Sequence, residues 1–162
     1  MIEPADEAPP HLVTYLANHA IEAEFLSPGV AMPTVATAAE AIGVPEEQIL
    51  KTLLFVGGDG GYVVAIASGV KRVDRNLLAQ ASGLVKPRAA KPEAVKEVIG
   101  YPAGGVAPLA LPAKVPVVVD SAVVALPVAF GGGGCEHLLL RVQPADIVRF
   151  NNATVASIVQ SD

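Results

Sequence analysis

The sequence predicts an α+β fold built as a single compact domain, in which helices surround a central mixed, largely antiparallel and partly barrel-like sheet. Three observations predict it. Two apolar, β-branched runs flank a glycine-rich turn, which indicates an antiparallel hairpin. Short helical segments with capping residues lie among further strand-like runs without regular alternation, which favours α+β over a doubly wound sheet. The length of 162 residues suits one domain, and the chain shows no internal repeat or interdomain linker.

The N-terminal part divides into a tail and a first helix. Residues 1–10 are proline-rich and acidic, so we expect a flexible segment ahead of a domain that occupies 11–162. Apolar residues at helical spacing then predict one helix over 11–26. A loop follows this helix.

Capping residues predict the next two helices. Thr37, followed three residues later by Glu40, has the pattern of a capping box, and Gly43 is placed to end that helix. Pro45 and the two glutamates after it are typical of a first helical turn, which predicts a short helix over 44–50.

The hairpin is predicted over 51–69. Its two apolar runs are separated by Gly-Gly-Asp-Gly-Gly at 57–61, and glycine tolerates the positive φ that such turns need. Two more helices follow it. The first has Asp74 as its N-cap and Gly83 after its end, and the second is predicted over 91–100 with proline in its first turn.

The C-terminal part returns to strand-like runs. Residues 115–120 predict a buried strand, and 126–144 predict two strands around the four-glycine turn at 131–134. A helix over 144–152 and a short final segment complete the predicted fold.

Charge is distributed unevenly along the chain. The net charge of −5 argues against tight nonspecific binding to nucleic acid. Residues 1–50 contain eight acidic residues and no Lys or Arg, so Lys51 is the first base of the chain. Residues 71–96 then hold seven of the eleven bases, and this segment is either a solvated surface or a footprint for a phosphate-bearing partner. Its predicted nucleic-acid contacts are Lys71, Arg72 and Arg75.

Composition excludes several classes of protein. No apolar run approaches the roughly 20 residues that span a bilayer, and residues 1–10 carry no positive charge, so we expect a soluble, cytoplasmic protein. The single cysteine, Cys135, excludes an internal disulfide and a multi-cysteine zinc site. The histidines lack metal-binding spacing, so we expect neither metal nor cofactor.

Three features are candidates for chemistry. Lys51 lies where a helix meets an apolar strand, as either a surface lysine or a cation that holds a phosphate, carboxylate or carbonyl oxygen. The glycines of 104–108 and 131–134 fit simple turns, but a backbone without side chains can also approach a ligand and donate N–H groups. Cys135 is either inert filler or a nucleophile.

Five stretches, in the order TAAEAIGVPEEQILKTLLFV, SGVKRVD, GYPAGGVAPLALP, VVVD and GGGG…LLLRVQPADIV, resemble the YbaK/ProX family. This family comprises aminoacyl-tRNA deacylases related to the editing insertion of bacterial prolyl-tRNA synthetase. The resemblance covers about residues 30–160. It implies a compact mixed domain with a largely antiparallel sheet. It also implies hydrolysis of the ester between a wrong amino acid and the terminal ribose of tRNA.

The resemblance further implies a set of site residues. The family lysine corresponds to Lys51, and the G-x-x-x-P loop corresponds to 104–108, in which Ala107 stands where many relatives have proline. The implied catalytic group is Lys51, Gly104 and Gly105. The implied substrate contacts are Thr52, Val106, Ala107, Pro108, Asp120, Gly131, Gly132, Gly133, Gly134 and His137.

We therefore expect a trans-acting deacylase of mischarged tRNA that uses no metal and no covalent nucleophile. Backbone N–H groups would stabilise the oxyanion, and the resemblance implies that a ribose hydroxyl helps to activate water. The expected partner is the tRNA acceptor end carrying a small amino acid, namely Ala, Ser, Cys or Thr. An aminoacyl-tRNA synthetase is a second candidate partner, and both monomer and homodimer stay open.

Two alternatives belong to other classes. The first is a non-catalytic module that uses the same pocket to bind an aminoacyl-tRNA end or a synthetase without turnover. The second is a thiol hydrolase based on Cys135.

Overall fold

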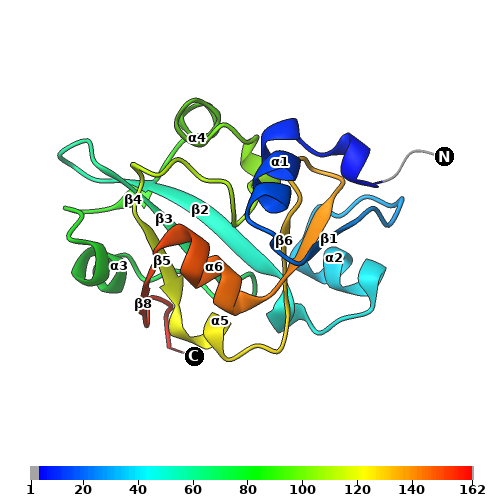
Figure 1. Ribbon diagram of the computed structural model, residues 1–162. Coiled ribbons are helices and arrows are strands. Elements are labelled where there is room, and N and C mark those ends of the chain that lie inside the picture. The colour runs from blue at the N-terminus through cyan, green and yellow to red at the C-terminus, as the bar shows by residue number, and fades with distance from the viewer. Residues whose placement is uncertain (1–3, 162) are drawn as a thin grey trace.

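The computed structural model describes residues 4–161 and contains two β-sheets with helices around them (Figure 1). The helices are α1 (Pro10–Asn18), α2 (Val35–Ile42), α3 (Arg75–Ser82), α4 (Pro92–Ile99), α5 (Ser121–Val124) and α6 (Pro144–Asn151). The strands are β1 (Ala23–Leu26), β2 (Leu50–Val56), β3 (Tyr62–Ser68), β4 (Arg88–Ala89), β5 (Val117–Asp120), β6 (Ala129–Gly132), β7 (Leu139–Val142) and β8 (Thr154–Ala156). Short 3-10 helices occupy Pro4–Glu7, Glu46–Gln48 and Ala103–Gly105.

The larger sheet has the strand order β4-β2-β3-β5-β8. The predicted hairpin forms its centre, because β2 and β3 pair antiparallel from Leu50 opposite Ser68 to Val56 opposite Tyr62. β3, β5 and β8 are parallel to one another. Long crossovers through helices connect these parallel strands, as parallel pairing requires.

The smaller sheet is antiparallel, with the order β1-β7-β6. A parallel bridge between Ile49 and Phe130 joins β6 to the start of β2, so the two sheets form one curved, partly closed surface. This arrangement confirms the expected α+β class with a mixed, largely antiparallel and partly barrel-like sheet.

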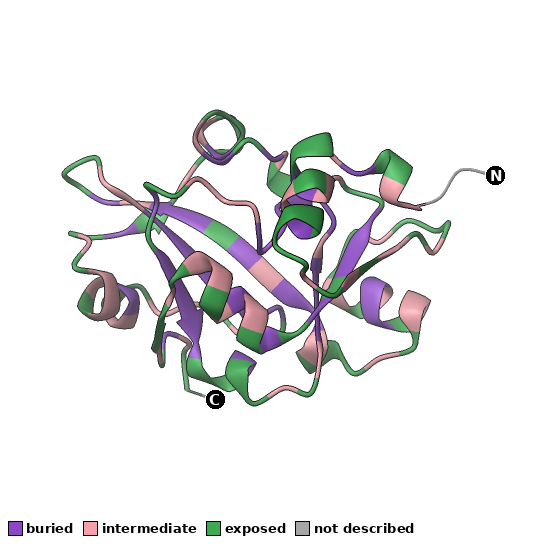
Figure 2. Cartoon of the chain, in the orientation of Figure 1, coloured by how far each residue is buried: buried purple, intermediate pink, exposed green. Residues whose placement is uncertain are grey.

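Both faces of β3 are buried, which explains its unbroken apolar sequence (Figure 2). Val64 and Ile66 point into the main core, which also contains side chains from α1, α4, α6 and β7. Val63 and Ala65 point to the opposite side and pack with Leu78 of α3. The hairpin is therefore the central layer of the molecule.

Most helix ends agree with the predicted caps. Asp74 caps α3, because its Oδ1 accepts hydrogen bonds from the backbone N–H groups of Asn76 and Leu77. Gly83 and Gly100 adopt the left-handed conformation after α3 and α4.

The predicted cap of α2 is wrong by one turn. Thr34 is the N-cap, and its hydroxyl accepts from the Thr37 N–H at 3.1 Å. The Thr37 hydroxyl in turn accepts from the Thr34 N–H at 3.0 Å. A threonine hydroxyl can serve either role in a capping box, and the helix therefore begins before Thr37.

The predicted single helix over 11–26 is also wrong. α1 ends at Asn18, Ala20 adopts a left-handed φ of 50°, and residues 23–26 become β1. β1 pairs antiparallel with β7 along its whole length. This pairing with a strand more than 110 positions away overrides the local helical spacing.

Two other segments differ in detail from the expectations. The first two glycines of 131–134 belong to β6, so the turn begins later than predicted. Residues 1–3 of the expected flexible segment lie outside the described residues, while Pro4–Glu7 form a 3-10 helix and Ala8 is buried. Within residues 4–161, each helix is too short or too polar to cross a membrane.

Asp120 gives a test of how the C-terminal segment is fixed. Its carboxylate is 1% exposed and accepts hydrogen bonds from the Ala122 N–H, at the start of α5, and from the Ile158 N–H at 2.9 Å. We expect Asp120→Ala to lower the free energy of unfolding by about 2–4 kcal/mol, since it removes a cap and a buried charged acceptor. Asp120→Asn keeps one acceptor oxygen, so its free energy of unfolding should fall by less. Urea denaturation of the three proteins measures this, and equal stability would contradict the assignment.

Candidate functional site

The candidate site lies where β2 and β6 diverge beyond the Ile49–Phe130 bridge. The Gly133 N–H donates to the Leu138 carbonyl at 2.9 Å, so these two residues form a hydrogen-bonded pair next to the β6–β7 ladder. Backbone groups in an antiparallel strand alternate in direction. Gly132 therefore directs its N–H and C=O away from β7, to the same side on which Phe130 reaches Ile49.

Thr52 lies on the facing edge of β2, and among residues 4–161 no ladder or bridge joins it to β6. On one side of β2 the Ile49 carbonyl accepts from the Gly69 N–H, and on the other side the Leu54 carbonyl accepts from the Ala90 N–H at 2.9 Å. By the same alternation, the N–H and C=O of Thr52 point away from β3, between the Phe130 contact and β4. Two strand edges, at Thr52 and Gly132, which no ladder or bridge joins within residues 4–161, thus border one opening.

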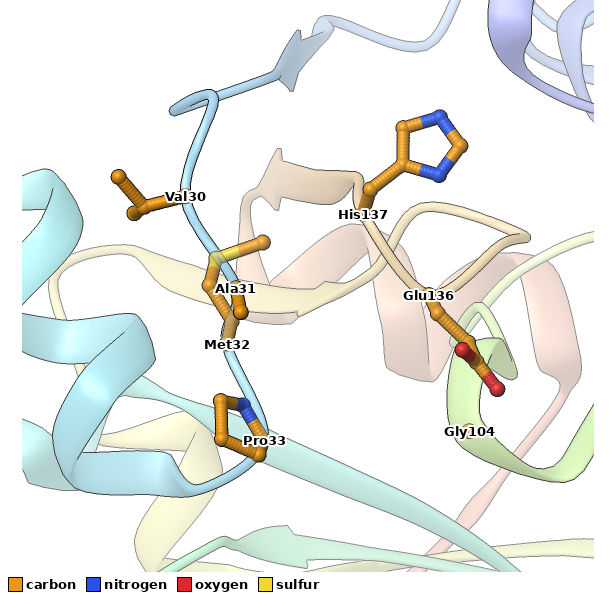
Figure 3. Close-up of a pocket in the computed structure, with 7 residues that line it drawn as sticks. All are labelled: Val30, Ala31, Met32, Pro33, Gly104, Glu136 and His137. Carbon is orange, nitrogen blue, oxygen red and sulfur yellow. The ribbon is translucent and has the colours of Figure 1, made fainter.

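A cavity of about 260 Å³ fills this opening, which we call the fork cavity. It is lined by Met32, Pro33, Thr34, Val35, Ala38, Ile49, Leu50, Lys51, Thr52, Leu53, Ala103, Gly104, Val106, Gly132, Glu136, Leu138 and Leu139. An outer cavity of about 500 Å³ shares Met32, Pro33, Gly104 and Glu136 with it and adds His137 (Figure 3). The two cavities form a continuous cleft.

Lys51 connects the fork cavity with a third cavity of about 430 Å³. Its half-buried side chain donates from Nζ to the Lys71 carbonyl at 3.5 Å. Arg72 and Arg75 line the third cavity, so the predicted lysine and two of the three predicted nucleic-acid contacts lie on one path. The resulting positive potential favours an anionic group on this side of Lys51.

Thr52, which lines the fork cavity, carries a buried hydroxyl without a hydrogen-bond partner among residues 4–161. The side chain is 8% exposed, and its Oγ1 has no hydrogen-bond partner within the described part of the chain. Burial of an unpaired hydroxyl is unfavourable, and such groups in native proteins usually have a functional reason or a bound partner.

The two glycine segments pack against each other. A Cβ at Gly105 would lie 2.7 Å from the Cys135 Cα, and one at Gly131 would lie 2.7 Å from the Pro108 ring. A Cβ at Gly132 would overlap the Val106 carbonyl. Close approach to the backbone at Gly105 and Gly132, and to the Pro108 ring at Gly131, therefore requires glycine at these positions.

Two hydrogen bonds hold the C-terminal end of the loop that carries 104–108. The buried Tyr101 hydroxyl donates to the Leu109 carbonyl at 2.9 Å, and burial raises the pKa of Tyr101. Asn151 donates from Nδ2 to the Pro108 carbonyl at 2.7 Å. These bonds fix the loop against the core.

The structure brings together five of the predicted site residues in the fork cavity, namely Lys51, Thr52, Gly104, Val106 and Gly132. The others pack behind its wall or lie elsewhere. Ala107 is fully buried in the main core, so its difference from proline does not alter the cavity surface directly. Both Asp120 carboxylate oxygens are used within the fold, as described above. His137 lines only the outer cavity and is 57% exposed.

Sequence reasoning missed Glu136 and the segment 30–35. Glu136 lines both cavities, and its carboxylate points toward Gly104, whereas the His137 ring points the other way (Figure 3). The segment 30–35 forms the opposite wall. A glutamate in a glycine turn gives no local signal for this position, because the cleft is assembled from distant strands.

Cys135 does not have the surroundings of an activated nucleophile. Burial raises the pKa of its thiol, with Glu7 and Glu136 adding to this effect, which keeps the group protonated. His137 Nε2 lies 3.8 Å from the Cys135 sulfur and 3.3 Å from Glu7 Oε2, so one ring nitrogen faces both groups. Within residues 4–161 no three acidic, histidine or cysteine side chains are placed to hold a metal ion.

Comparison with known proteins gives a family and several relatives. The family described as "Aminoacyl-tRNA editing domain" matches residues 30–150. A protein of Enterococcus faecalis named "Putative Cys-tRNA(Pro)/Cys-tRNA(Cys) deacylase EbsC" is 26% identical over 126 residues, which cover 78% of this chain and 77% of that protein.

Two solved structures are similar over nearly the whole chain. Hypothetical protein APE2540 is 33% identical with a TM-score of 0.85, and the match covers 93% of this chain and 99% of the other. A structure described as "a putative trans-editing enzyme for prolyl tRNA synthetase" is 26% identical with a TM-score of 0.81, covering 99% of this chain and 100% of the other. The family match includes Lys51, both glycine segments and the fork cavity between them. The chain therefore belongs to the aminoacyl-tRNA editing domain family.

Proposed function

We propose that this protein is a trans-acting aminoacyl-tRNA deacylase that hydrolyses the ester of a mischarged tRNA without a metal or a covalent protein nucleophile. One observation carries the proposal beyond family membership. The fork cavity brings the strand edges at Thr52 and Gly132 together with Lys51. The trans-acting form is supported by the description of the solved relative.

The fork supplies what ester hydrolysis requires from a protein. Water attacks the ester carbonyl carbon and forms a tetrahedral intermediate whose negative charge lies on the former carbonyl oxygen. The N–H groups of Thr52 and Gly132 border the opening and can donate to this oxyanion. Collapse of the intermediate releases the free amino acid, and the ribose oxygen leaves with the proton that the water gave up. The ribose hydroxyl that the family resemblance implies would assist removal of this proton.

Lys51 and the third cavity account for the tRNA side of the substrate. A lysine ammonium acts as a point charge for a phosphate or a developing oxyanion. Arg72 and Arg75 extend this positive region away from the ester, where the phosphates of the acceptor end would lie. The contact is local, which is compatible with a net charge of −5.

The fork cavity is suited to a small aminoacyl side chain. Its wall consists mainly of apolar side chains and glycine, and it encloses about 260 Å³. We propose that the removed residue is one of Ala, Ser, Cys and Thr. The name of the Enterococcus relative, which specifies cysteine, supports this range.

Lys51 gives the most direct test of the proposed chemistry. We expect Lys51→Ala to lower kcat/KM for deacylation by about 100-fold or more, because a positioned cation is lost beside the reacting ester. The melting temperature should change little, since Lys51 is only half buried. A panel of tRNAs mischarged with Ala, Ser, Cys and Thr, followed by release of the amino acid, measures the effect.

Two controls accompany this variant. Lys114→Ala removes an exposed lysine beside a different cavity and should keep full activity. Cys135→Ala should also stay active, and its inactivation would favour the thiol hydrolase instead. If the unmodified protein instead protects every mischarged tRNA from hydrolysis of its ester, the result would favour the non-catalytic binding module.

Substitution of Thr52 tests whether its hydroxyl contacts the substrate or is only buried. Thr52 and Ser68 are 8% and 7% exposed, and neither hydroxyl has a partner among residues 4–161. Thr52→Val and Ser68→Ala should each leave stability unchanged or raise it by about 1 kcal/mol, because an unpaired buried hydroxyl is lost. Only Thr52→Val should reduce deacylation, by about 10-fold. Equal activity of the two variants would refute a substrate contact by Thr52.

A further inference from the structure

The fork cavity contains charged side chains of opposite sign on different walls. Lys51 comes from β2, and Glu136 comes from the β6–β7 turn. The other residues that line this cavity are uncharged. On the far side of Lys51 the cleft continues to Arg72 and Arg75, with Asp74 bound as the α3 cap between them, whereas on the side of Glu136 it continues to the outer cavity. The cleft therefore has a positive side and a negative side.

Glu136 is an exposed residue that lines the cleft, and the fold does not use its carboxylate. Its carboxylate makes no hydrogen bond or ion pair with residues 4–161. It lies over Gly104, where an added Cβ would come within 3.2 Å of Glu136 Oε1. Glycine at 104 thus leaves the space that this carboxylate occupies, and the carboxylate faces the cavity rather than a neighbouring cation (Figure 3).

Thr52 is a further polar residue among those that line the fork cavity. Its side chain is 8% exposed, and its buried hydroxyl has no partner in the described chain.

We propose that Glu136 binds the α-ammonium group of the aminoacyl ester and so restricts the substrate to esters with a free amino group. This inference rests on the proposed function. An aminoacyl-tRNA end has the same polarity as the cleft, with an ammonium group on the amino acid and phosphates beyond the ribose. With the phosphates toward Lys51 and the arginines, the ammonium lies toward Glu136, and charge-assisted hydrogen bonding holds it there.

The pairing has a consequence for specificity. An α-amino group is mostly protonated at neutral pH, but acylation converts it to a neutral amide. A peptidyl-tRNA or an N-acetylated aminoacyl-tRNA would then leave the Glu136 carboxylate partly desolvated and without a cation, which is unfavourable. Glu136 would thereby exclude peptidyl-tRNA from hydrolysis.

The test measures binding separately from turnover. The probes are 3′-(L-alanylamino)-3′-deoxyadenosine 5′-phosphate, whose amide resists hydrolysis, and its N-acetyl derivative. NMR titration gives the dissociation constant of each probe for the unmodified protein, Glu136→Gln and Glu97→Gln. Glu97 is an exposed glutamate of α4 beside a different cavity, so the last variant makes the same charge change elsewhere.

We expect the unmodified protein and Glu97→Gln to bind the free amine about 10-fold more tightly than the N-acetyl probe. Glu136→Gln should bind both probes equally, because it loses affinity only for the free-amine probe. A preference that persists in Glu136→Gln, or no binding of either probe to the unmodified protein, overturns the inference. Deacylation of the mischarged tRNA panel is scored in parallel. If the mischarged tRNAs are hydrolysed but Glu136→Gln still prefers the free-amine probe, only the role of Glu136 is rejected. If the preference for the free amine depends on Glu136 but no tRNA is hydrolysed, only the hydrolytic function is rejected.

Discussion

The bridge between Ile49 and Phe130 is the contact on which the site depends. It joins the two sheets at one point, and beyond that point β2 and β6 diverge. A continuous ladder would have paired the backbone groups of Thr52 and Gly132 with each other. Their separation leaves these groups directed into a cavity, and the rigid hairpin behind β2 keeps the opening in place. In the proposed reaction the hydrogen-bond donors come from these strand edges and not from side chains.

The glycines serve the packing of this opening as much as its chemistry. Gly105 and Gly131 let the two segments approach each other closely, and Gly132 adds an edge that faces the cavity. The cavity wall therefore consists of two segments that pack against each other. Tyr101 and Asn151 donate hydrogen bonds to the Leu109 and Pro108 carbonyls at the end of the first segment. Ala107 lies in the buried layer, which explains how proline can be replaced there without changing the surface that meets a ligand.

Local features of the fold could be predicted from the sequence, whereas the pairings between distant segments could not. The hairpin, the α3 cap at Asp74 and the glycine ends of α3 and α4 depend on neighbouring residues, and they were predicted correctly. β1 was mistaken for helix because its partner β7 is remote in sequence. For the same reason the fork itself, and the position of Glu136 across from Lys51, had no signal in the sequence. Lys51 was identified as the first base after fifty residues without Lys or Arg, and from the family resemblance.

Backbone NMR of the amide resonances, with a non-hydrolysable aminoacyl-adenosine added, tests most directly whether the strand edges bind the aminoacyl ester. We expect the largest shifts at the amides of Thr52 and Gly132, with smaller changes at Gly104. The cavity lined by Tyr62 and Lys114 should stay unaffected. Shifts concentrated at that other cavity, with Thr52 and Gly132 unchanged, would show that the strand edges do not bind the ester.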